Sequence, residues 1–310
     1  MKVWLFHLAI LSALALAQAL LPPYHANNLA RIMVLAVYAM GYNIAFGYSG
    51  LLSLGHALLF GAGMYAAGLL LHHAGLAALP ALLTGALAGG MVAALVGLLA
   101  LRTAGVSFMI VTLMFAQVGY LTILYFNGFT GGDEGIALSG DQRRILGVDM
   151  TQDGPRFWAA FLLFALALTA NLLIVGSRFG RIMLAMRENE ERSRMLGFNP
   201  YTTKLKILLI SGIYSGAAGA AYAILFGYFG ASFASVQYSI LPMLYVLLGG
   251  AGTVLGPLLG AGLMFYLVDF TSSLTTAYLF VVGAALVIIV LFAPKGILGA
   301  VRARWLKWLP

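Results

Sequence analysis

The sequence contains no cysteine, which excludes disulfide bonds, thiolate metal sites and cysteine nucleophiles together. It also contains no Gly-Lys dipeptide, although the phosphate-binding loop of nucleotide hydrolases ends in glycine, lysine and serine or threonine. Nothing in it resembles a nucleophile with its base, and no carboxylate pair has the setting for general acid and base work. We therefore expect no catalytic residues, no metal site and no enzymatic activity in this chain.

Charged residues are scarce as well. They make up 8% of the 310 residues, against roughly a quarter in soluble proteins, whereas hydrophobic residues make up 62%. This composition is typical of a polytopic membrane protein. The net charge of +8 would suit nucleic acid only if the basic residues clustered on a folded surface, but here they flank apolar runs. We expect no nucleic-acid partner.

Apolar runs predict an all-α protein with one transmembrane domain over residues 1–310 and about ten crossings. The expected crossings are 3–21, 29–47, 57–71, 79–100, 105–126, 157–175, 207–229, 238–252, 254–270 and 276–293. The first run follows Lys2 and ends in small residues, so it also imitates a cleavable signal peptide. We favour a retained helix because the run reaches about 19 residues, near the length that crosses a bilayer.

Two of these runs are weak as simple crossings. Residues 57–71 and 238–252 each have only about 15 residues, and the second contains Pro242. Short, interrupted segments often mark broken helices beside a transport pathway, and a tilted helix in a thin bilayer is an equal alternative. The pentapeptides 46–50 and 226–230 both read Phe-Gly-Tyr-X-Gly, five crossings apart, which is the spacing of an inverted repeat.

The region 177–206 is a polar island that must lie outside the bilayer. Its seven basic residues are Arg178, Arg181, Arg187, Arg192, Arg194, Lys204 and Lys206. Because lysine and arginine favour the cytoplasmic side, we place this loop in the cytoplasm. Both termini then lie in the cytoplasm, and of the 17 lysine and arginine residues only Arg31, Arg143, Arg144 and Arg156 fall outside.

Opposite charges recur in this island at helical spacing. Glu188 precedes Arg192 by four residues, and Glu190 precedes Arg194 by four, so we expect a short helix with two ion pairs. A charged, helical loop between two crossings is where a soluble partner would bind a membrane protein. If ATP drives this protein, its hydrolysis takes place on another chain and must act through this loop.

The loop at about 127–156 is the long loop expected on the outer side. Its Gly-Gly-Asp-Glu-Gly sequence at 131–135 could imitate an oxygen-rich cation site, but it lacks the alternating ligand spacing of a calcium loop. We expect a turn at the entry of the loop.

Few residues inside the crossings could carry chemistry. Asp269 is the one acidic residue in an expected crossing, so coupling to an ion gradient has little support. His56 suits a hydrogen-bonded structural role, with a gating or substrate-binding role as the alternative. The series Gly252, Gly256 and Gly260 predicts a close-packing helix face, either within the chain or at a subunit interface.

Four stretches resemble the permease subunits of bacterial ABC importers for branched-chain amino acids, in particular the larger of the paired permeases. They are residues 47–56, residues 130–136, the region 180–197 with Arg187-Glu188-Asn189-Glu190, and residues 249–257. The resemblance extends from about Asn28 to Gly299 and includes the ending Pro294-Lys295-Gly296-Ile297. Leu52 and Met64 depart from the family pattern near the expected pathway, which leaves the substrate open.

The resemblance implies an all-α permease of the type II ABC importer kind that works by alternating access. It implies coupling to an ATPase through Gly180, Arg187, Glu188, Asn189, Glu190 and Gly197. It implies a pathway or gate at Gly47, Tyr48, Gly50, Ser53, Gly55, His56, Gly249, Gly250, Gly252, Gly256 and Pro257. Gly131, Gly132, Asp133 and Gly135 of the outer loop complete the expected site.

The resemblance also implies an assembly in the bacterial inner membrane. Its members are a second permease subunit, two cytoplasmic ATPase subunits that hold ATP and Mg²⁺, and an extracytoplasmic substrate-binding protein. This chain itself is expected to bind no cofactor. The expected cargo is branched-chain or similar apolar amino acids. Urea or short amides are the alternative within the family, and an ion-coupled secondary transporter is the alternative outside it.

Overall fold

The structure, a computed structural model, describes residues 2–277, 280–284, 287, 291 and 295–304. Its long helices are α1 (Lys2–Leu20), α2 (Pro23–Asn43), α3 (His56–Ala74), α4 (Ala78–Ala100), α5 (Val106–Tyr125), α7 (Asp153–Gly176), α10 (Pro200–Phe226), α11 (Val236–Gly249) and α12 (Gly256–Leu274). The shorter helices are the π-helix η1 (Ile44–Tyr48), α6 (Asn127–Thr130), η2 (Asp141–Arg143), α8 (Arg178–Glu188), α9 (Glu190–Met195), η3 (Ala231–Ala234) and α14 (Gly296–Arg304). Two small antiparallel pairs join β1 (Ile136–Ala137) to β4 (Tyr228–Phe229) and β2 (Arg144–Ile145) to β3 (Val148–Asp149).

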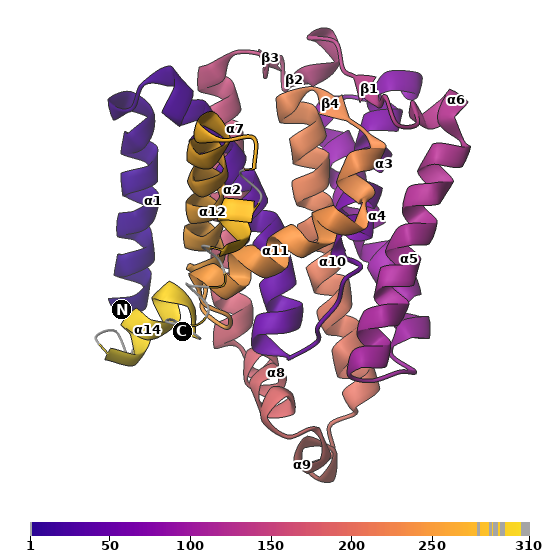
Figure 1. Ribbon diagram of the computed structural model, residues 1–310, viewed down its shortest axis with the longest axis vertical. Helices are drawn as coiled ribbons and strands as arrows, with labels where there is room; N and C mark the ends of the chain where they lie inside the picture. Colours follow the sequence, from indigo (N-terminus) through magenta and orange to yellow (C-terminus); the bar gives the residue numbers. More distant parts are fainter. Residues whose placement is uncertain (1, 278–279, 285–286, 288–290, 292–294, 305–310) are drawn as a thin grey trace.

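Eight helices of the described residues are long and apolar enough to cross a membrane. They are α1, α2 with η1, α3, α4, α5, α7, α10 and α12, which makes this an all-α, multi-pass membrane protein. The expected crossing at 238–252 is wrong as a full crossing. The helix α11 has 14 residues and runs obliquely (Figure 1), and at 1.5 Å per residue it covers about 21 Å of a bilayer core of about 30 Å. The expected crossing at 276–293 includes residues outside the described part and stays a prediction.

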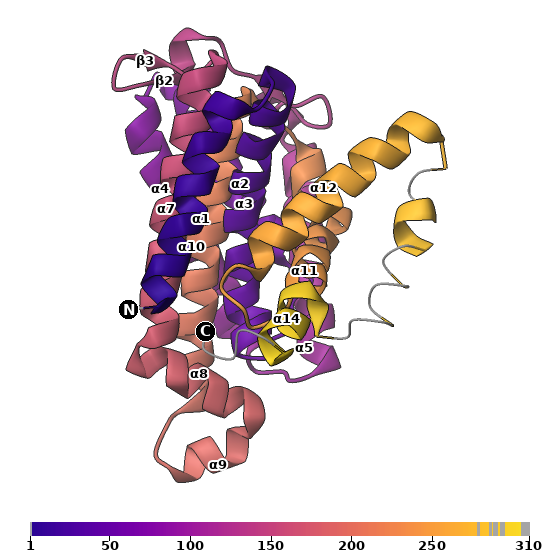
Figure 2. The ribbon, with the colours of Figure 1, turned by 90° about the vertical axis from the view of Figure 1, so that its left-hand side faces the viewer.

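Three helices form the centre of the bundle. The share of the apolar window that is buried is 83% for α2, 72% for α10 and 56% for α3, but only 6% for α1. Figure 1 and Figure 2 show α2 and α10 inside, with α1 on the outside and α12 inclined against the bundle. The peripheral helices therefore offer most of the surface that suits lipid.

Glycines allow the central helices to approach closely. A β-carbon at Gly89 of α4 would lie 2.4 Å from the carbonyl oxygen of Gly212 of α10, and one at Gly216 would lie 2.6 Å from that of Gly85. The glycine series near α12 behaves similarly, because a β-carbon at Gly260 would lie 1.7 Å from a backbone oxygen of α11. These small residues pack helices of the same chain against one another.

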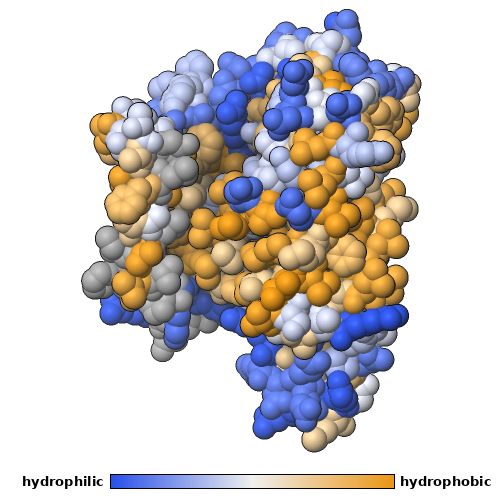
Figure 3. Space-filling model, turned by 45° about the vertical axis from the view of Figure 1, so that its right-hand side comes forward, coloured by the Kyte–Doolittle hydropathy of each residue, from blue (hydrophilic) through white to orange (hydrophobic). Residues whose placement is uncertain are grey.

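An apolar band separates two hydrophilic ends (Figure 3). One end carries α8 and α9, with the N-terminal start of α1 and α14 also toward that side (Figure 1). The opposite end carries both strand pairs (Figure 1). We call them the α8–α9 end and the strand end.

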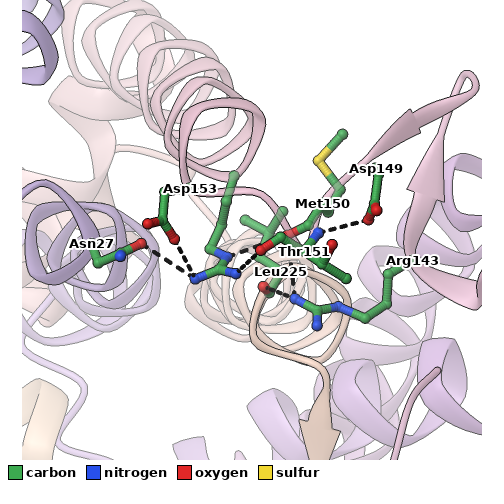
Figure 4. Close-up of polar contacts among 8 residues, drawn as sticks. Asn27, Arg143, Asp149, Met150, Thr151, Asp153 and Leu225 are labelled. Atoms are coloured by element: carbon green, nitrogen blue, oxygen red, sulfur yellow. Dashed lines mark hydrogen bonds and ion pairs between the residues drawn. The ribbon is translucent and has the colours of Figure 1, made fainter. Parts of the chain in front are cut away.

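Two buried or partly buried arginines fasten the loop at the strand end (Figure 4). Arg143 donates to the carbonyl oxygens of Ile224, at 2.8 Å, and Leu225, so it pairs backbone acceptors in the last turn of α10. Arg143 and Arg156 both donate to the carbonyl oxygen of Met150, at 3.3 and 3.2 Å. These bonds fasten the loop between α6 and α7 to the end of α10.

The repeated pentapeptides lie at opposite ends of the bundle. The first forms η1 at the end of α2, on the α8–α9 side, and the second ends α10 and enters β4 at the strand end (Figure 1). Their local conformations differ, because Gly47 is in a π-helix whereas Gly227 is a left-handed C-terminal cap with φ of 73°. The first is followed by an irregular segment and then α3, and the second by the short helix η3 and then α11. This placement agrees with the inverted relation expected from the spacing.

Candidate functional site

The segment that protrudes from the α8–α9 end consists of two short helices. The Ser177 hydroxyl caps α8 by accepting from the N–H of Gly180 at 3.2 Å. Asn189 has extended backbone angles, which end α8, and its side chain caps α9 by accepting from the N–H of Arg192 at 2.9 Å. A β-carbon at Gly180 would lie 2.2 Å from the carbonyl oxygen of Val175, so this corner requires glycine.

A short helix with two internal ion pairs was expected, and the two pairs are wrong. The helix break at Asn189 puts Glu188 and Arg192 on different helices. Glu190 instead pairs with Lys204 of α10, with Nζ to Oε2 at 2.6 Å. This pair fastens the start of α9 to the base of a central helix.

Arg187 connects α8 to the end of α2. Its guanidinium donates to the carbonyl oxygen of Gly47, which lies in η1. Gly47 is buried, and a β-carbon there would lie 1.9 Å from Asn43 Oδ1 and 2.6 Å from Gly252 N. A π-helical turn is uncommon and frequently occurs at functional sites. The guanidinium of Arg187 therefore reaches the end of α2, although the residue as a whole is exposed. Its expected role in coupling to an ATPase stays a prediction.

Asn43 binds the loop between α11 and α12. Its side chain is fully buried, its Nδ2 donates to the carbonyl oxygen of Thr253 at 2.9 Å, and its Oδ1 accepts from the N–H of Gly252 at 2.9 Å. A polar side chain inside an apolar crossing is the signal that could have found it. We call Asn43, Gly47, Gly252 and Thr253 the Asn43 junction.

The glycines of the second expected gate stretch shape the loop beside this junction. Gly250 and Gly252 have φ of 123° and 74°, which residues with a side chain rarely adopt. A β-carbon at Gly249 would lie 1.8 Å from the carbonyl oxygen of Gly256, so the end of α11 crosses the start of α12 at these two residues. Pro257 lies in the first turn of α12, where its missing N–H costs nothing.

The first expected gate stretch runs from the junction into the bundle. Tyr48 is buried, and Gly50, with φ of 74°, lines a cavity of about 310 Å³ together with Leu52, Met109 and Lys204. Lys204, which lines this cavity, is also the partner of Glu190 at the start of α9, so the cavity lies next to the α8–α9 segment.

The rest of that stretch is packed against neighbouring helices. Ser53 is buried and accepts from the N–H of Gly55 at 3.2 Å, and a β-carbon at Gly55 would lie 2.7 Å from the carbonyl oxygen of Thr112. His56 is fully buried, and its Nε2 lies 2.8 Å from Ser211 Oγ, which donates to a backbone oxygen of α2 at 2.6 Å. The geometry around His56 is that of a structural hydrogen bond.

The outer-loop candidates lie at the strand end, away from the Asn43 junction. Gly131, Gly132 and Gly135 have φ of 76°, 54° and 69°, and the N–H of Gly135 donates to the carbonyl oxygen of Gly131 at 3.0 Å. They form a turn, and Asp133 is exposed on it. Within the described part of the chain, no group of three or more histidine, aspartate and glutamate residues could hold a metal ion.

Exposed apolar side chains mark the end of the protruding segment. Met195 is 84% exposed and Leu196 is 69% exposed, at the end of α9 and directly after it. Gly197 follows with φ of 89°. Sequence reasoning passed over this apolar pair, although its position inside the charged region 177–206 is itself a signal. Exposed apolar side chains with a polar surround are typical of protein interaction sites.

Comparison with known proteins gives the context of this geometry. Residues 24–291 match the family model described as "Branched-chain amino acid transport system / permease component". The chain is 27% identical to the high-affinity branched-chain amino acid transport system permease protein LivM of Salmonella typhimurium, over 88% of this chain and 69% of that protein. It is 28% identical to the protein of the same name from Escherichia coli, with the same coverage.

A shorter match covers an archaeal protein. Over 88 residues, 28% of this chain, the identity is 32% to the probable branched-chain amino acid transport permease protein LivM of Methanocaldococcus jannaschii. No solved structure matches the chain. Because the family model matches most of its length, this chain belongs to the family of permease components of branched-chain amino acid transport systems.

Proposed function

We propose that this chain is the membrane permease subunit of an ATP-driven importer for branched-chain amino acids, and that ATP is hydrolysed on separate subunits. The observation that carries the proposal is the Arg187 bond, which joins a protruding segment to a buried junction between α2 and the α11–α12 loop. The family membership supports the transport function, and the names of the relatives support the cargo.

The ATPase subunits dock on the α8–α9 segment. Its exposed surface combines the apolar pair Met195 and Leu196 with the exposed carboxylates of Glu188 and Glu191. An apolar centre with a charged rim is the usual composition of a protein interface. The Glu190–Lys204 pair and the Asn189 cap fix the shape of this surface, and they are positioning contacts for it.

Movement of the segment reaches the bundle through the Asn43 junction. A displacement of α8 acts on Gly47 through Arg187, and Asn43 transmits it to Gly252 and Thr253 at the start of the α11–α12 loop. Interfaces of this kind switch between discrete arrangements because packed cores do not deform continuously. The junction therefore acts as the gate control of an alternating-access cycle.

The orientation follows from the basic residues. With the α8–α9 end in the cytoplasm of a bacterial cell, both termini are cytoplasmic, and the strand end faces a substrate-binding protein outside the inner membrane. A second permease subunit completes the membrane part, and two ATPase subunits hold ATP and Mg²⁺. This chain contributes the pathway and the docking segment.

The proposal is tested by reconstituting the chain with its partner subunits in liposomes. Uptake of labelled leucine should require ATP and the binding protein, should persist with an ionophore present, and should compete with isoleucine and valine but not with urea. Uptake that needs an ion gradient without ATP would reject the proposal, and competition by urea alone would reject the cargo.

A further inference from the structure

The C-terminal helix α14 packs directly on the loop that Asn43 holds. A β-carbon at Gly296 would lie 2.4 Å from Gly250 Cα, and one at Gly250 would lie 2.8 Å from Gly299 N. The first turn of α14 is therefore in close contact with the loop between α11 and α12. A shift of the loop toward α14 therefore requires α14 to shift with it.

A side chain of α14 adds a polar bond to this contact. Arg302 Nη1 donates to the carbonyl oxygen of Gly252 at 3.2 Å. The backbone N–H of Gly252 donates to Asn43 Oδ1 at 2.9 Å. Gly252 is thus held through its N–H by α2 and through its carbonyl by α14.

Two arginines therefore hold the two sides of the Asn43 junction. Arg187 of α8 binds Gly47 on the α2 side, and Arg302 of α14 binds Gly252 on the loop side. Lys295, directly before α14, and Arg304, its last residue, are exposed, and α14 itself lies toward the end that carries α8 and α9 (Figure 1).

We infer that α14 is a second coupling element, and that Arg302 is the positioning residue through which a displacement of α14 by the docked ATPase subunit reaches the α11–α12 loop at Gly252. The inference rests on the proposed function. It adds a second input to the same junction, so that α8 moves the α2 side while α14 moves the loop side. Motion of the two sides relative to each other is what opens the junction.

The test compares Arg302→Ala with Arg304→Ala in the full complex in liposomes. Both variants remove one positive charge from α14, but only the first removes a bond to Gly252. The measured quantity is the number of ATP molecules hydrolysed per leucine transported. We expect it to rise about tenfold in Arg302→Ala, because losing a hydrogen bond from a charged group costs about one decade in an equilibrium constant. It should stay unchanged in Arg304→Ala, and Arg302→Lys should recover part of the coupling.

The double variant Arg187→Ala with Arg302→Ala separates coupling from simple destabilisation. Because both arginines act on one junction, their combined effect on the ratio should be smaller than the product of the single effects. A merely structural role would lower uptake and ATP hydrolysis together and leave the ratio unchanged, which would overturn the inference. If Arg187→Ala raises the ratio and Arg302→Ala does not, α14 is no coupling element. If neither does, the proposed coupling route itself fails.

Discussion

Replacing Arg187 by alanine should uncouple the permease while leaving it inserted and assembled. The substitution removes the guanidinium that binds Gly47 O but keeps the helix caps at Ser177 and Asn189 and the apolar pair of the proposed docking surface. Hydrogen bonds to charged groups contribute about 1.5–3 kcal/mol. Because Arg187 is exposed overall, although its acceptor is buried, the lower value applies. About 1.5 kcal/mol corresponds to roughly a tenfold change in the equilibrium between the two arrangements of the junction.

The assay is ATP-dependent leucine uptake in liposomes, with ATP hydrolysis and co-purification of the ATPase subunits measured on the same samples. We expect uptake to fall about tenfold at an unchanged amount of complex. Arg181→Ala is the matched control, because Arg181 lies exposed on the same helix and makes no side-chain hydrogen bond or ion pair with the described residues. Normal uptake in Arg187→Ala, or an equal loss in Arg181→Ala, would refute the role of the Gly47 bond.

Three further predictions concern stability, orientation and packing. Asn43→Ala leaves the buried carbonyl of Thr253 and the N–H of Gly252 without their partner, at a cost of about 1–3 kcal/mol each, so the thermal unfolding midpoint in detergent should fall. An unchanged midpoint would show that these two hydrogen bonds do not stabilise the fold. Because the chain has no cysteine, an impermeant thiol reagent on spheroplasts should label Ser139→Cys and spare Met195→Cys, which is 84% exposed on the other end; the reverse pattern would overturn the orientation. Gly256→Leu should abolish assembly or uptake, since a β-carbon there would lie 2.6 Å from a backbone oxygen, whereas Gly176→Leu has open space and should be tolerated; equal tolerance would reject the close contact.

The cysteine that reports the cytoplasmic side in the labelling experiment must be placed at an exposed residue of the loop 177–206. Ser193 lies in the same loop but is only 2% exposed, and its hydroxyl donates to the carbonyl oxygen of Asn189 at 3.0 Å. A cysteine at 193 would be protected whichever side it faced, so only an exposed position such as Met195 can report the side of the membrane.

Hydrophobic run length alone predicts the peripheral crossings well. The expected runs 79–100 and 105–126 correspond to α4 (Ala78–Ala100) and α5 (Val106–Tyr125). These helices lie at the surface of the bundle, with only 28% and 17% of their apolar windows buried, so their composition reflects a single environment. The same measure misjudged α11, because a short, oblique, partly buried helix is as apolar as one that crosses the bilayer.

The candidate site could be predicted in its location but not in its contacts. The polar island 177–206 is visible in the sequence, and so are the glycines around positions 47 and 252. The Asn43 bonds join residues about 210 positions apart, and their partners on the loop are backbone groups, which leave no trace in residue type. The partner of Glu190 was missed for a related reason. Lys204 lies in α10, beyond the turn that separates α9 from α10, and charge spacing along one helix does not reveal such a contact.

The claim that partner ATPase subunits act through the α8–α9 segment is tested most directly by photo-crosslinking in the purified complex. A photoreactive residue at Met195 should form a covalent product with the ATPase subunit, identified by mass spectrometry. The same residue at Leu146, which is 83% exposed in the hairpin at the strand end, should form none. An intact complex that yields no ATPase product from position 195 would contradict the account.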